Sequence, residues 1–306
     1  MPSNVGALHL DWGISLAGAL VGFVVGLTGM GGGALMTPVL VIFFGIDPLA
    51  AVSSDIVAAV VMKPVGGAVH ARQGTVNMGL VRWLALGSVP AAFCGVLVLR
   101  AIGAPDFADR MKILLGVVLL VAAASIVAKG VIQARRRDLE APLGVHEIVV
   151  RPFPTLLIGM IGGLMVGMTS VGSGSLIIVM LMLLYPRLPS SGLVGTDLVQ
   201  AIPLVLSAAV GHLLFGDLEL GLTTSLLIGS VPGVYLGARV SSRAPDRIIR
   251  PILVAVLTLS ALKLLGAPDA VVLALMVGTA FGAVLAYAWR ARTVDRSPEP
   301  SEPAPD

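Results

Sequence analysis

Two short stretches rich in glycine and hydroxyl residues carry most of the groups in this chain that are suited to bind a ligand. They cover residues 26–33 and 167–174. Each glycine costs a helix about 1 kcal/mol relative to alanine, so both stretches are expected to interrupt a helix. An interrupted helix exposes N–H groups, and a helix N-terminus favours negative charge. The predicted anion-binding residues are Thr28, Gly29, Gly31, Gly32, Thr169, Ser170, Gly172 and Ser173.

The second apolar segment after each stretch, at about 49–70 and 190–213, adds a hydroxyl and a carboxylate. Ser54 precedes Asp55, and Thr196 precedes Asp197. We expect the two hydroxyls to join the anion site, although small residues also serve close helix packing. Two interpretations of the carboxylates remain open. Either they bind a coupling proton or cation, or they cap the start of their helices.

Three further ionisable side chains lie in apolar segments: Lys63, His70 and His212. A charge at the bilayer centre costs at least about 2.5–3.5 kcal/mol, so Lys63 is a candidate to attract an anion; pairing or reaching the membrane surface is the alternative. The histidines are assigned to proton coupling, with interfacial hydrogen bonding as the other interpretation. Because ligating side chains are not clustered, we predict no metal site, and no cofactor is predicted. The basic residues cluster in short loops and at the C-terminus, as expected of a membrane protein, so no nucleic-acid partner is predicted.

Composition places these residues in a membrane. Of the 306 residues, 57% are hydrophobic and 12% charged, against about 25% charged in a soluble domain, and the mean hydropathy is +0.99. The apolar runs are continuous, which indicates helices rather than the alternating strands of a barrel. The fold class is therefore an all-α polytopic membrane protein. Helices are predicted at about 12–28, 34–45, 49–70, 79–100, 108–133, 153–168, 174–185, 190–213, 220–240, 247–265 and 269–289.

The chain contains an internal duplication. Matching glycines and threonines of the two stretches lie 141 positions apart, and the aspartates and histidines named above lie 142 apart. Five segments per copy is an odd number, so the copies are expected in opposite orientation. Inverted repeats with helix breaks at matching positions are typical of transporters, whose substrate site lies where the breaks meet. We therefore expect the two breaks to face each other.

Charge sets the predicted orientation. Arg135–Arg137 and the basic loop at 241–250, which includes Arg250, indicate the cytoplasmic side, and so does the basic C-terminus. The short segments at 34–45 and 174–185 are either full spans or re-entrant, so the span count is about eight to eleven. The predicted units are a first membrane repeat at 1–134, a cytoplasmic linker at 135–151, a second repeat at 152–266, an extra helix at 267–290 and a disordered tail at 291–306.

The paired glycine stretches, the Ser54-Asp55 and Thr196-Asp197 pairs, and the segment from His70 to Gly74 resemble the TauE/SafE sulfite-exporter family of bacterial permeases. The resemblance covers about residues 14–265. It implies a permease of the bacterial inner (plasma) membrane that moves a small sulfur-containing anion, such as sulfite or an organosulfonate. The chain departs from its own duplication at Lys63, which is matched by Val205.

Two other functions remain open, a passive anion channel and a membrane scaffold without transport. An enzyme is not predicted. An intramembrane serine protease with Ser173 and His212 would require glycine where Val171 stands, and no Gly-Lys-Ser/Thr sequence follows the glycines to bind phosphate. The anion, the direction of transport, the coupling ion and the oligomeric state are left undetermined.

Overall fold

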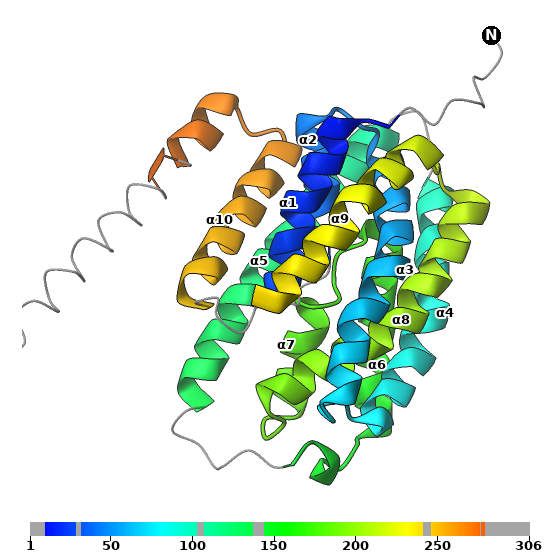
Figure 1. The fold of residues 1–306 in the computed structure, drawn as a ribbon, viewed down its shortest axis with the longest axis vertical. Helices are drawn as coiled ribbons and strands as arrows, with labels where there is room; N and C mark the ends of the chain where they lie inside the picture. The colour runs from blue at the N-terminus through cyan, green and yellow to red at the C-terminus, as the bar shows by residue number, and fades with distance from the viewer. Residues whose placement is uncertain are drawn as a thin grey trace, which may run out of the picture.

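The computed structural model describes residues 10–28, 32–102, 107–136, 144–240, 246–275 and 277–278, which fold into a helical bundle (Figure 1). The helices lie within a few residues of their predicted positions, because continuous apolar runs fix them locally. They are α1 (Trp12–Thr28), α2 (Gly33–Phe43), α3 (Pro48–Arg72), α4 (Met78–Ile102), α5 (Phe107–Arg136), α6 (Pro152–Thr169), α7 (Leu176–Leu184), α8 (Ser190–Phe215), α9 (Leu220–Val240) and α10 (Asp246–Leu264), with a 3-10 turn at Val145–Glu147.

Six of these helices are long and apolar enough to cross a membrane: α3, α4, α5, α6, α8 and α9. Large apolar side chains point outward from the bundle, such as Leu20 on α1 and Leu214 on α8, which are 63% and 64% exposed. Such a surface suits lipid, and the chain is a multi-pass membrane protein. The predicted helix at 269–289 and the tail at 291–306 lie largely outside the described residues.

Helices from the two halves of the chain pack against one another. α1 pairs with α9, α4 with α6, α3 with α8 and α5 with α10; in Figure 1 the blue α1 lies beside the yellow α9. Glycines allow the closest approaches. A Cβ on Gly87 of α4 would overlap the carbonyl oxygen of Leu156, and one on Gly229 of α9 would overlap that of Ser15. These two contacts join positions that are equivalent under the 141–142-residue spacing.

The break between α6 and α7 requires its glycines. Ser170 caps the end of α6 with a left-handed φ of 61°. The turn continues through Gly172 and Gly174, with φ of 142° and 84°. Side chains with a Cβ rarely adopt these angles, so the predicted interruption at 167–174 is confirmed. α7 then runs for only 9 residues, about half of what a span needs.

The first break lies between α1 and α2, and it meets the second. α2 has 11 residues and begins at Gly33, while residues 29–31 lie outside the described part of the chain. A Cβ on Gly33 would overlap the carbonyl oxygen of Ser170. The start of α2, at the end of the first glycine stretch, is therefore in direct contact with the second break.

Candidate functional site

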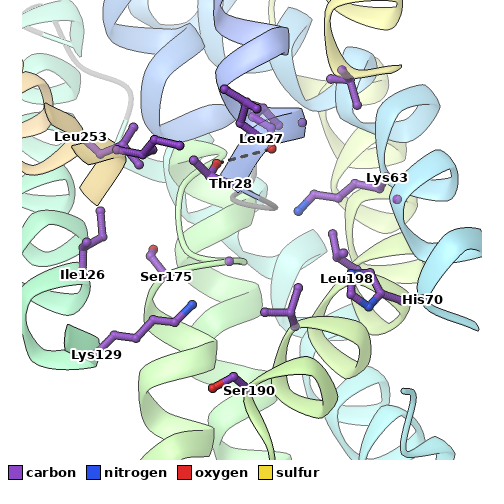
Figure 2. Close-up of a pocket in the computed structure, with 18 of the residues that line it drawn as sticks. Leu27, Thr28, Lys63, His70, Ile126, Lys129, Ser175, Ser190, Leu198 and Leu253 are labelled. Atoms are coloured by element: carbon purple, nitrogen blue, oxygen red, sulfur yellow. Dashed lines mark hydrogen bonds between the residues drawn. The ribbon is translucent and has the colours of Figure 1, made fainter. Parts of the chain in front are cut away.

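A cavity of about 520 Å³ lies beside the breaks (Figure 2). Helices from both halves form its walls, including α1, α3, α5, α8 and α10. The polar groups on the walls include Thr28, Lys63, His70, Lys129, Ser175 and Arg250. Among the described residues that line the cavity, none is acidic. The described part of the lining therefore contains cationic but no acidic side chains.

Lys63 is the most deeply placed cation of the cavity. It lies in the second half of α3 and is only 6% exposed. Its Nζ donates to Ser173 Oγ at 2.6 Å, in the break of the other half of the chain. The acidic groups that interact with it electrostatically are Asp197 and Asp55. Lys63 thus reaches the second break, where a buried ammonium can be stabilised by acceptors and by an anion.

Asp197 holds the second break in shape. It is fully buried, and its Oδ2 accepts the backbone N–H of Gly174 at 2.6 Å. Its Oδ1 accepts from Gln200 Nε2 at 3.0 Å. The carboxylate therefore caps the turn before α7 rather than the start of its own helix. Hydrogen bonds to a charged acceptor are stronger than those between neutral groups, so the Asp197 carboxylate is well suited to stabilise this turn.

Asp55, the matching residue of the first half, is bonded differently. It is also fully buried, and its Oδ2 accepts from Ser170 Oγ at 2.6 Å. Its Oδ1 has no partner with hydrogen-bond geometry among the described residues, although the Thr37 hydroxyl and the Lys63 ammonium both interact with the carboxylate. Asp55 therefore links α3 to the break of the other half and keeps one buried oxygen unsatisfied, which is unusual and calls for an explanation.

The two histidines also occupy different surroundings. His212 is buried, with Nδ1 at 2.9 Å from Ser53 Oγ and Nε2 at 2.8 Å from the carbonyl oxygen of Gly167. His70 lines the cavity, and its Nδ1 lies 3.0 Å from Thr75 Oγ1. The structure thus brings His70, but not His212, to the cavity wall.

The residues whose hydroxyls were predicted to bind the anion also differ in whether they line the cavity. Thr28 lines the cavity, and its Oγ1 donates to the carbonyl oxygen of Val24 at 2.9 Å. Thr169 donates to the carbonyl four residues earlier at 2.7 Å, and Thr196 accepts the backbone N–H of Asn77 at 3.1 Å, so both stabilise backbone. Ser54 is fully buried, and its Oγ has no partner among the described residues. Of these four, the described cavity wall includes Thr28 alone.

The glycines predicted to bind the anion do not all lie at the cavity. Gly32 lines the cavity, and a Cβ there would lie 3.4 Å from Asp55 Oδ1. Gly172 forms the turn after α6. Gly29 and Gly31 lie outside the described residues, so their assignment to the site stays a prediction.

Two cations of the cavity were missed by reasoning on the sequence. Lys129 was not singled out, and Arg250 was assigned to a cytoplasmic loop. Lys129 lies on α5, and Arg250 lies on α10, where its Nη1 donates to Gln133 Oε1 at 2.6 Å. A signal was present, because Ile126, Lys129 and Gln133 share one face of a helix at three- and four-residue spacing. The neighbouring sequence gave no indication that this face of α5 packs beside the helix breaks.

Together these features define a multi-pass membrane protein with a cavity, lined by cationic side chains, beside the break between α6 and α7 and the start of α2. Residues 14–264 match the family described as sulfite exporter TauE/SafE. The chain belongs to this family, which confirms the resemblance drawn from the motifs.

Three relatives show how far the similarity extends. The chain is 38% identical to "Probable membrane transporter protein YjnA" of Bacillus subtilis (strain 168), over 82% of this chain and 98% of that protein. It is 22% identical to "Probable membrane transporter protein YdhB" of the same strain, over 76% and 90%. A "Probable membrane transporter protein" of Xylella fastidiosa (strain Temecula1 / ATCC 700964) is 25% identical over 74% and 83%. No solved structure matches this chain.

Proposed function

We propose that this protein is a transporter that carries a small anion, such as sulfite or an organosulfonate, across the bacterial plasma membrane. The observation that carries the proposal is the buried Lys63, which lines a cavity without acidic walls among its described residues. A cation in such surroundings is stabilised when an anion binds beside it. The family description and the names of the relatives support transport, and the proposal assigns the chain no enzymatic reaction.

Alternating access is the proposed mechanism. The support is the reciprocal packing of the two halves, with α1 on α9 and α4 on α6, and the contact between the two breaks. Inverted repeats that rock against each other expose a shared site first to one side and then to the other. The cytoplasmic C-terminus stays part of the proposal and rests on the basic residues of the linker and tail.

Flux in proteoliposomes tests this function. Purified protein is reconstituted, and uptake of sulfite, thiosulfate, sulfoacetate and sulfate is measured with and without a pH gradient. Lys63→Met should lower uptake at least about tenfold, since a hydrogen bond to a charged group contributes about 1.5–3 kcal/mol. The control is Lys112→Met on α5, where the lysine is 43% exposed and pairs with Asp109.

The other functions give different results in the same experiment. A passive channel would show flux that follows the anion gradient alone and ignores the pH gradient. A scaffold would show no flux and would tolerate Lys63→Met and glycine-to-alanine changes in the breaks. Absence of flux for every anion, with correctly inserted protein, would contradict transport of these substrates.

We infer further that Asp55 is the proton-coupling residue, and that Asp197 serves the break. Asp55 has a buried oxygen free of hydrogen bonds among the described residues, suited to carry a proton, whereas both oxygens of Asp197 are bonded. His70 on the cavity wall is the candidate relay, and the fully bonded His212 is the weaker one. Asp55→Asn should retain exchange of anion across the membrane but lose acceleration by a pH gradient. Continued acceleration in the variant would contradict this role.

A further inference from the structure

A buried row of hydrogen bonds joins α8 to α4 in the second half of the chain. Gln200 Nε2 donates to Asp197 Oδ1 at 3.0 Å, and Gln200 Oε1 accepts from Ser88 Oγ at 3.2 Å. All three side chains are fully buried. An amide carries donors on its nitrogen and an acceptor on its oxygen, so it satisfies both neighbours at once. Gln200 thus connects the carboxylate to a hydroxyl of the adjacent helix.

The first half repeats the two ends of this row but lacks its middle. Under the 142-residue spacing the corresponding residues are Asp55 for Asp197, Ala58 for Gln200 and Ser230 for Ser88. Ala58 is fully buried on α3, and it presents a methyl group where the amide would lie. The carboxylate and the hydroxyl of this half therefore have no side chain to connect them.

The backbone around this position matches that of the second half. α3 packs against α9, and α8 packs against α4. A Cβ on Gly22 of α1 would overlap the carbonyl oxygen of Ser230, and one on Gly163 of α6 would overlap that of Ser88. The two serines thus lie in equivalent contacts, and Ser230 is expected to lie toward α3 as Ser88 lies toward α8.

The buried oxygens of the first half lack hydrogen bonds here. Asp55 Oδ1, Ser230 Oγ and Thr37 Oγ1 have no partner with hydrogen-bond geometry among the described residues, and all three side chains are fully buried. The Thr37 hydroxyl and the Lys63 ammonium interact with the Asp55 carboxylate. Under the 141-residue spacing, Thr37 is matched by the apolar Ile178. Because buried polar atoms are nearly always paired, a small polar ligand is expected at this place.

Water suits this place better than a metal cation does. A buried water needs about two to four polar partners, and the unpaired oxygens of Asp55, Ser230 and Thr37 supply them. An amide group is larger than a water molecule, so the room that glutamine fills in the second half suffices for water in the first. A cation would lie near the Lys63 ammonium, which already interacts with Asp55, and like charges repel strongly in buried surroundings.

We propose that water takes the place of the Gln200 amide in the first half and connects Asp55 to Ser230, so that Ala58 is what allows Asp55 to exchange a proton. An amide nitrogen only donates, so the arrangement around Asp197 favours an ionised carboxylate. Water and a hydroxyl both donate and accept. They donate to Asp55 Oδ1 when it is ionised and accept from it when it carries a proton. This inference rests on the proposed proton coupling at Asp55 and names the position that restricts coupling to one half.

Thermal unfolding of the purified full chain tests the water site. Ala58→Gln supplies the amide of the second half, whereas Ala58→Leu, the matched control, fills the same room without hydrogen bonds. The glutamine variant should unfold at least about 4 °C higher than the leucine variant, because leucine leaves the buried oxygens without partners. Ser230→Ala should lower the unfolding temperature, since it removes a partner of the water. Loss of a hydroxyl without any partner would raise that temperature instead.

Infrared difference spectra between acidic and alkaline buffer test the exchange of the proton. The band of a protonated buried carboxyl should appear in the wild-type protein and disappear in Asp55→Asn. At the pH where the wild-type band is half developed, Ala58→Gln should weaken it at least about fivefold, because the amide favours the ionised form. The same variant should lose acceleration of uptake by a pH gradient. Ala58→Ser, which leaves room for water, should keep both the band and the acceleration.

Each remaining outcome overturns the inference or its basis. Equal unfolding temperatures of the glutamine and leucine variants, or a rise with Ser230→Ala, overturn the water site. An unfolding temperature that rises in NaCl but not in choline chloride, and no longer does so in Ser230→Ala, assigns the place to a sodium ion instead. An unchanged carboxyl band in Ala58→Gln overturns the role of this position, and absence of the band in the wild-type protein contradicts proton coupling at Asp55. Absence of flux for every anion contradicts the proposed function, while the unfolding comparison still decides the water site.

Discussion

In the second half of the chain, both carboxylate oxygens of Asp197 accept hydrogen bonds, whereas among the described residues only one oxygen of its counterpart Asp55 does. The histidines repeat this difference. His212 has a partner at each ring nitrogen within the protein, while His70 lies on the cavity wall. A third duplicated pair also differs. Lys63 of the first half lines the cavity, whereas its counterpart Val205 in the second half is part of the buried apolar core.

This comparison distinguishes residues that stabilise the fold from residues that can bind a ligand or a proton. A duplicated residue that has all its hydrogen bonds inside the protein stabilises the fold, because removing one partner leaves the other unsatisfied. A residue with an open position can bind a ligand or a proton. We therefore propose that the second half mainly holds the break in place and that the first half supplies most of the groups that respond to the anion.

The largest expected effect tests the shared framework. Gly87→Ala and Gly229→Ala should each destabilise the fold by about 3 kcal/mol or more, since the new Cβ overlaps backbone that cannot move. The two losses should be similar, because the contacts are equivalent. The measurement is thermal unfolding of the purified protein in detergent. Gly130→Ala on α5 is the control, since nothing lies within 4 Å of its Cβ position, and it should gain up to about 1 kcal/mol. A tolerated change at either paired glycine would break the equivalence.

The next effect tests the two carboxylates. Asp197→Ala should cost about 3 kcal/mol of unfolding free energy, because the N–H of Gly174 and the amide of Gln200 lose a charged acceptor. Asp55→Ala should cost less, about 1.5 kcal/mol, because it removes the acceptor of a single hydrogen bond, from Ser170, and one of the two acidic groups that interact with Lys63. Chemical denaturation of both variants gives the two values. A greater loss of unfolding free energy in the Asp55 variant would contradict the assignment of Asp197 to fold stability and of Asp55 to proton coupling.

The smallest effect tests the histidines. His212→Ala should cost about 2 kcal/mol, since both ring nitrogens have partners within the buried core. His70→Ala should change stability by less than about 1 kcal/mol, because its surroundings are partly open to the cavity. The same unfolding measurement compares them. Equal stability losses would show that the open position of His70 has no energetic consequence.

The predicted breaks and helices show what local chemistry decides. Continuous apolar runs placed helices such as α1 and α9 at their observed bounds, since a helix satisfies its own backbone within one segment. Gly172 and Gly174 marked the second break because their left-handed φ angles exclude most other residues. The burial of Lys63 followed from its position within an apolar helix.

Contacts between distant residues were decided by the tertiary structure alone. Ser170 bonds to Asp55 across 115 positions, and Lys63 reaches Ser173 across 110. Nothing in the duplicated motifs distinguishes Asp55 from Asp197, since the difference lies in the partners that each meets after packing. Lys129 and Arg250 became part of the cavity only when α5 and α10 packed together beside the breaks. A sequence determines the backbone preferences of each segment, whereas burial, partners and the sign of a cavity arise from helices that meet in space.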